Sequence, residues 1–185
     1  MSWLGEAPHR LISFADEPSD NDDARLRKRV GVIAGYVTIV APLALVVQAQ
    51  GHPLSWSLAV ALPLFSIGNL LVLARSGRFD RYVVALIAAG TAFVPLATWV
   101  GGGITGASSG LVWAFLVPAY AIMALGPRRA MPWFVAFLAS VALMVLADRF
   151  ARDAIGTPPY PLQLLGQTQN AVVPLVITFL LLRYT

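Results

Sequence analysis

The chain has 185 residues, of which 58% are hydrophobic and only 12% are charged. Soluble domains carry about 25% charged residues, so this composition excludes a water-soluble domain and indicates an integral membrane protein. The net charge of +4 does not indicate nucleic-acid binding, because the basic residues form short clusters between apolar runs. Cysteine is absent, which excludes disulfides, thiolate metal sites and a cysteine nucleophile.

Residues 1–29 are predicted to form a cytosolic N-terminal tail. They hold six of the nine acidic residues, and they lack the basic start and early apolar core of a secretory signal peptide. The stretch SDNDDARLRKR predicts a short helix before the membrane, capped by Ser19 or Asp20 and with acids in its first turn. The apolar residues of the tail either lie on the membrane surface or belong to a mobile segment; they include Trp3, Leu11, Ile12 and Phe14.

Six apolar runs follow the tail, and each approaches the ~20 residues that cross ~30 Å of hydrocarbon. Lipid offers backbone groups no hydrogen-bond partner, so each run is predicted to be a helix. The expected fold is therefore all-α: residues 30–185 form an integral membrane bundle of six transmembrane helices. The expected helices are residues 30–49, 56–74, 82–100, 106–125, 131–147 and 163–182.

The basic residues predict the orientation of this bundle. With six helices, 11 of the 13 Lys and Arg residues fall on one side of the membrane and two on the other. Cytoplasmic loops carry the excess of Lys and Arg, so both termini are predicted to be cytoplasmic, in the inner membrane of a bacterium. The main topology determinants are Arg75, Arg78 and Arg81 before the third run and Arg128 and Arg129 before the fifth; the two outer residues are Arg149 and Arg152.

Two short patterns concern helix placement. Aromatic residues near the ends of the runs are predicted to anchor the bundle at the membrane interfaces, with Trp56, Trp99 and Tyr160 outside and Tyr82, Trp133 and Tyr184 inside. Gly31-x-x-x-Gly35 permits close approach of another helix, but it does not identify that helix.

The sequence predicts no catalytic residue and no metal site. Residues 106–110, GASSG, match the G-x-S-x-G pattern of serine hydrolases, but such a serine needs a histidine base. The two histidines, His9 and His52, lie in the tail and the first outer loop, so Ser108 and Ser109 are interpreted as loop residues. Asp148 and Asp153 alone provide too few ligands for a metal ion.

Polar residues inside the predicted helices are few. No ionisable residue lies in the middle of a run, which argues against a proton relay but leaves open a transporter or channel for a neutral solute. Prolines within the runs either create a pocket or hinge by kinking the helices, or only affect packing. The polar start of the sixth run either lines an outward-facing cavity for a small-molecule ligand or sits at the interface; its residues are Gln163, Gln167, Gln169 and Asn170.

The stretch SSGLVWAFLVPAYAIMALGPRRAMPWFVAFLA, which starts at Ser108, resembles part of the N-terminal membrane domain of bacterial class III adenylate/guanylate cyclases. The shared features are a serine-rich outer turn, a tryptophan, an apolar helix with a proline, an inner Gly-Pro-Arg-Arg turn and a Trp-Phe pair that opens the next helix. SDNDDARLRKRV and VVPLVITFLLLRY resemble the flanks of the same domain. Comparable membrane modules also precede histidine kinases.

The resemblance implies a membrane anchor and sensor domain that contacts lipid, forms a homodimer and acts through its sixth helix on a cytosolic cyclase domain. That catalytic domain, with its ATP or GTP and divalent metal, is absent from residues 1–185, so no cofactor is expected within them. We expect the chain to be the N-terminal part of a longer protein. The alternatives are the membrane sensor of a histidine kinase and a small transporter or channel for a neutral solute.

Overall fold

The computed structural model describes residues 12–40, 42, 53–106, 111–156 and 159–161, and single positions from 164 to 175. Within these residues the regular structure is entirely helical. Three helices are long and apolar enough to cross a membrane, spanning Trp56–Ser76, Phe79–Val100 and Pro127–Ala154. The chain is therefore a helical membrane protein, as its composition predicts.

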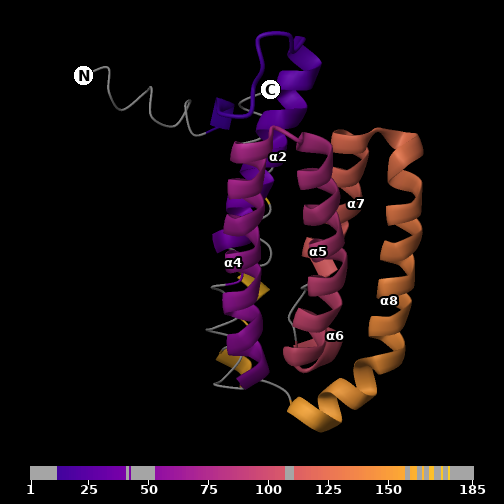
Figure 1. The fold of residues 1–185 in the computed structure, drawn as a ribbon. Coiled ribbons are helices and arrows are strands. Elements are labelled where there is room, and N and C mark those ends of the chain that lie inside the picture. The colour runs from indigo at the N-terminus through magenta and orange to yellow at the C-terminus, as the bar shows by residue number, and fades with distance from the viewer. Residues whose placement is uncertain are drawn as a thin grey trace.

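The bundle consists of α2 (Asp22–Val40), α4 (Pro53–Ser76), α5 (Phe79–Val100), α7 (Leu111–Leu125) and α8 (Pro127–Ile155), with the one-turn helix α6 (Gly103–Gly106) between α5 and α7. The central helix is α5, which packs against α4, α7 and α8 (Figure 1). On one side of it, α2 packs against α4 and α7.

The predicted runs overlap these helices where the structure describes them, and residues 41 and 43–49 of the first run lie outside the described residues. The second and third runs correspond to α4 and α5, which extend a few residues further. The fifth run was predicted too short, because α8 starts at Pro127 and continues to Ile155. Of the fourth run, Gly106 belongs to α6 and Leu111–Leu125 form α7, and residues 107–110 lie outside the described residues. The sixth run lies mostly outside the described residues.

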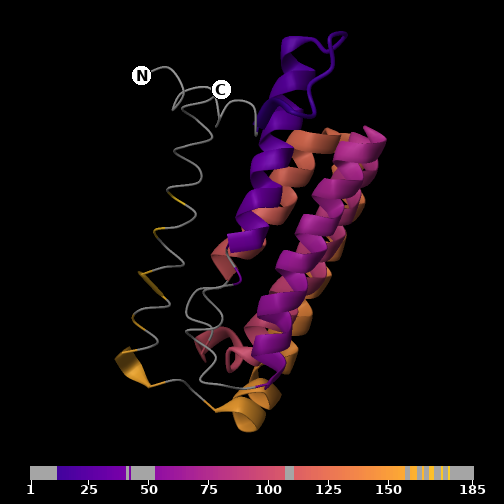
Figure 2. The same cartoon turned by 60° about the vertical axis from the view of Figure 1, so that its left-hand side comes forward.

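The predicted pre-membrane helix and the start of the first run form one helix. α2 continues from Asp22 to Val40, across position 29–30, where the tail was predicted to end. Its first turns project beyond the neighbouring helix ends (Figures 1 and 2). The predicted cap residues were wrong: Asn21 Oδ1 accepts the backbone N–H of Ala24 at 2.8 Å, the usual N-cap contact. Asp22 and Asp23 occupy the first turn as predicted.

A tight turn joins α7 to α8. Gly126 has φ +78°, a conformation that favours glycine, and Pro127 follows as the first residue of α8, where its missing N–H costs nothing. The Gly-Pro pair therefore ends one helix and starts the next within a single residue. This turn carries Arg128 and Arg129 to the same end of the bundle as the α4–α5 turn (Figure 1).

The outward faces of the long helices are apolar. Large hydrophobic side chains remain exposed along α4 and α8, including Leu64 and Val72 on α4 and Leu138, Leu146 and Phe150 on α8. Soluble proteins rarely expose continuous apolar surfaces of this extent. Hydrocarbon solvates such side chains, so these two helix faces suit a lipid environment.

Candidate functional site

The basic residues gather at one end of the bundle. Arg75, Arg78 and Arg81 lie in or beside the α4–α5 turn, and Arg128 and Arg129 lie in the first turn of α8, next to the α7–α8 turn. A salt bridge of 3.2 Å between Arg129 Nη1 and Asp80 Oδ2 joins the two turns. Both side chains are exposed, so this pair contributes little stability. The salt bridge does show that the two turns lie side by side. All five arginines that were predicted to determine the topology therefore lie at one end of the bundle.

The acidic part of the tail folds back onto the start of α2. Lys28 Nζ donates to Glu17 Oε1 at 2.9 Å and to Asp20 Oδ2 at 2.8 Å. Arg29 donates through Nε and Nη2 to Asp16 Oδ2, at 3.0 and 2.8 Å. Residues 12–21 are therefore held by ion pairs to the first turns of α2, and these basic residues already have partners.

The charge pairs shift the protonation of two of these groups. The hydrogen bond from Lys28, together with one from the backbone N–H of Glu17, lowers the pKa of Asp20. Desolvation alone would lower the pKa of Lys28, but its hydrogen bonds to Asp20 and Glu17 outweigh this effect and raise the pKa. Both groups are therefore charged at neutral pH, and the ion pair persists there.

The opposite end of the bundle is organised by Asp148. Its Oδ1 accepts the backbone N–H of Ile104 in α6 at 2.6 Å, and its Oδ2 pairs with Arg152 at 2.8 Å. A Cβ on Gly103, whose φ is +83°, would collide with this carboxylate. Asp153 instead makes a loose 3.9 Å pair with Arg149. Each aspartate thus has an arginine partner, and no cluster of three or more acidic or histidine ligands occurs among the described residues.

The Gly31-x-x-x-Gly35 face of α2 packs against aromatic side chains of α5 and α7. Tyr82 donates its hydroxyl to the Gly31 carbonyl at 2.9 Å, and a Cβ on Gly31 would lie only 2.7 Å from Phe79 Cε2 and 3.0 Å from the Tyr120 hydroxyl. Tyr82 is 2% exposed, so its prediction as an interfacial anchor was wrong. Its hydroxyl instead occupies the space beside Gly35, whereas Phe79 and Tyr120 occupy the space beside Gly31.

A hydroxyl pair joins α2 to a third helix, α4, deeper in the bundle. Thr38 and Ser66 join α2 to α4 through a 2.8 Å hydrogen bond. Ser66 is fully buried. Such pairs are common where small polar residues hold membrane helices together.

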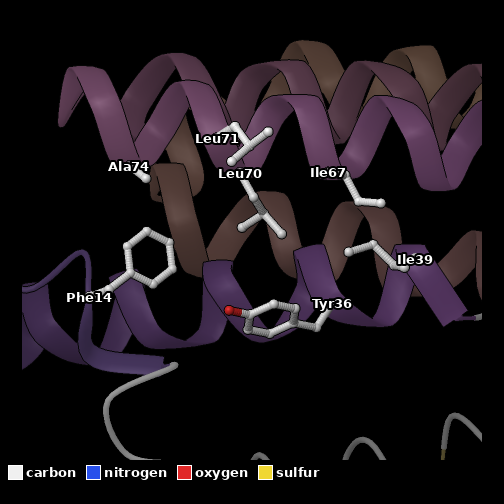
Figure 3. A pocket seen from close by; sticks show the side chains of 7 residues that line it. All are labelled: Phe14, Tyr36, Ile39, Ile67, Leu70, Leu71 and Ala74. Atoms are coloured by element: carbon white, nitrogen blue, oxygen red, sulfur yellow. The ribbon is translucent and has the colours of Figure 1, made fainter.

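An apolar groove lies between the N-terminal segment, α2 and α4. Its volume is about 300 Å³. Figure 3 shows Phe14 opposite Ala74 at one end and Ile39 opposite Ile67 at the other. The lining residues are Phe14, Tyr36, Ile39, Ile67, Leu70, Leu71 and Ala74. The sequence did not predict this groove; it placed Phe14 among apolar tail residues that either lie on the membrane surface or belong to a mobile segment.

The predicted ligand-binding amides are not shown as a site. Gln167 is an exposed helical position, and Gln163, Gln169 and Asn170 lie outside the described residues. Ser108, Ser109 and both histidines also lie outside the described residues. These interpretations therefore remain predictions.

No protein-family model, no curated protein and no solved structure matches the chain.

Proposed function

We propose that the chain is a multi-pass domain of a bacterial inner membrane, with its basic end in the cytoplasm. Five arginines in two turns lie at one end, together with the basic start of α2, whereas Arg149 and Arg152 lie at the other. This segregation follows the positive-inside rule. A sixth spanning helix would return the C-terminus to the cytoplasm.

Reporter fusions test this orientation. Fusions of a cytoplasmic reporter after Arg78 and after Arg129 are expected to be active, because both turns follow the basic pattern. Fusions within residues 101–110 and 152–160 are expected to be active only with a periplasmic reporter. A periplasmic signal after Arg129 would contradict the proposed orientation.

Within the membrane, we propose the role of anchor and sensor for a class III adenylate/guanylate cyclase domain. The observation that carries this proposal is the cyclase-like stretch from Ser108 onward, whose Gly-Pro-Arg-Arg segment forms the α7–α8 turn at the basic end. In such a protein the sixth run would lead to the catalytic domain, which would supply the ATP or GTP site and its divalent metal. Two copies would associate to form the cyclase active sites.

The proposal is tested on the full-length protein in membranes, with nucleotide cyclisation as the readout. Insertion of one, two or four residues after Arg183 rotates the downstream helix by ~100° per residue. Cyclase activity is expected to change with this helical phase, because the sixth helices of two copies would set how the catalytic domains meet. A deletion of residues 1–185 is expected to abolish membrane-dependent control.

Two results would overturn the cyclase proposal. The first is a reading frame downstream of codon 185 that encodes no cyclase domain. A histidine kinase domain at that place would retain the sensor role, and a stop codon would favour a small transporter or channel. If a cyclase domain is present but insertions of every length leave its activity and regulation unchanged, the membrane domain is an anchor only.

A further inference from the structure

The guanidinium groups around the α4–α5 turn have no partner among the described residues. The side chains of Arg75, Arg78 and Arg81 are exposed and make no hydrogen bond or ion pair in the part of the chain that the structure describes. Lys28 and Arg29 differ, because three carboxylates of the folded-back tail neutralise them. The end of α4 therefore carries positive charge that is available to a partner outside the protein.

The apolar groove leads along α4 toward this charge. Ile67, Leu71 and Arg75 follow one another at intervals of four residues, so they share one face of the helix. Ile67 and Leu71 line the groove, and Arg75 lies one turn beyond Leu71. The distance along the helix axis from Ile67 to Arg75 is about 12 Å. This face is thus apolar within the bundle and basic at its cytoplasmic end.

We propose that the groove binds one acyl chain of an anionic phospholipid of the cytoplasmic leaflet, with Arg75 contacting the lipid phosphate. Charge complementarity selects this occupant. The cytoplasmic leaflet carries negative surface charge, and a guanidinium forms strong charge-assisted hydrogen bonds with phosphate. The acids that follow Phe14 in the tail, Asp16, Glu17 and Asp20, are paired with Lys28 and Arg29 and therefore repel the phosphate less. The apolar lining of the groove suits an acyl chain whose head group lies at the basic end.

This inference rests on the proposed orientation of the bundle, but its test does not depend on that orientation. The purified chain in neutral detergent is mixed with dioleoyl phosphatidylglycerol or dioleoyl phosphatidylcholine, and bound lipid is counted by native mass spectrometry. The wild-type chain is expected to retain phosphatidylglycerol preferentially. Arg75→Gln is expected to weaken this binding about fivefold, since one basic residue near an anionic head group contributes about 1 kcal/mol. The matched control, Arg149→Gln at the opposite end, is expected to bind normally.

A second pair of variants tests the groove itself. Leu71→Trp should fill it and reduce retention of phosphatidylglycerol, whereas Leu146→Trp, on an exposed face of α8, should not. Equal retention of the two lipids by the wild-type chain would overturn the proposal. So would equal losses from Arg75→Gln and Arg149→Gln, or unchanged binding by Leu71→Trp. If Leu71→Trp does not fold, the comparison of the two lipids and the two arginine variants still test the proposal. If the lipid-binding assay contradicts the proposal while the reporter fusions give the expected pattern, the lipid site is rejected and the proposed orientation is retained.

Discussion

Replacement of Gly35 by alanine is expected to destabilise the bundle by about 1–3 kcal/mol, the usual cost of overpacking a filled core. A Cβ at this position would collide with the Tyr82 hydroxyl and lie 3.2 Å from Leu70 Cδ2. Alanine favours helix by up to about 1 kcal/mol over glycine, which offsets only part of this cost. The apparent melting temperature in detergent, followed by the loss of monodisperse protein on heating, measures the effect.

Tyr82→Phe provides the rescue experiment for Gly35→Ala. Removal of the hydroxyl oxygen eliminates the colliding atom, and the remaining nearest contacts to the new Cβ are those of Leu70. The double variant is therefore expected to be more stable than Gly35→Ala alone, although it loses the hydrogen bond to Gly31, worth about 0.6 kcal/mol on average in a membrane. Gly68→Ala is the matched control, because no atom lies within 4 Å of its Cβ. Equal melting temperatures for Gly35→Ala and Gly68→Ala would show that α2 does not pack against α5 in this way.

Replacement of Asp148 by alanine is expected to destabilise the end of the bundle that carries α6 by about 1.5–3 kcal/mol. It removes the acceptor of the Ile104 N–H and the partner of Arg152 at once. Both lost contacts are charge-assisted, and the Asp148 carboxylate is only 17% exposed, so solvent screens them weakly. The apparent melting temperature is expected to fall by several degrees, at about 2–4 °C per kcal/mol for a chain of this size.

Asp153→Ala is the control for the same charge change five residues further along α8. Its 3.9 Å pair with Arg149 is exposed on both sides, so its loss is expected to cost less than about 0.5 kcal/mol. Asp148→Asn, which keeps an acceptor oxygen, should fall between the two. Similar melting temperatures for Asp148→Ala and Asp153→Ala would contradict the assigned role of Asp148 in holding α6.

The helices of the fold could be predicted because continuous apolarity is a local property of the sequence. Their ends were less predictable, since a helix extends past its apolar run wherever the flanking polar residues also favour helix. α8 shows this, because Asp148–Ile155 was predicted to be an outer loop and remains helical. Asn21 shows it at the start of α2, where three adjacent polar residues could each have been the cap and backbone geometry selected the third.

The contacts between helices could not be predicted, because they join residues far apart in the sequence. Tyr82 lies near the end of an apolar run, where interfacial tyrosines are common, and nothing local indicates that Gly31, 51 residues earlier, accepts its hydrogen bond. The groove could not be predicted for the same reason, since its walls combine Phe14, two residues of α2 and four of α4. The gathering of arginines at one end was predictable, because alternation of spans and turns determines it.

The unbroken course of α2 connects the charged tail directly to the membrane bundle. Three carboxylates of residues 12–21 pair with Lys28 and Arg29, less than one helical turn before Gly31, whose carbonyl accepts the Tyr82 hydroxyl. Gly31 also lies against Phe79 and Tyr120, so the tail is anchored within about 5 Å, along the helix axis, of the contacts between α2, α5 and α7. A displacement of the tail is therefore expected to move these contacts directly, without passing through a flexible joint.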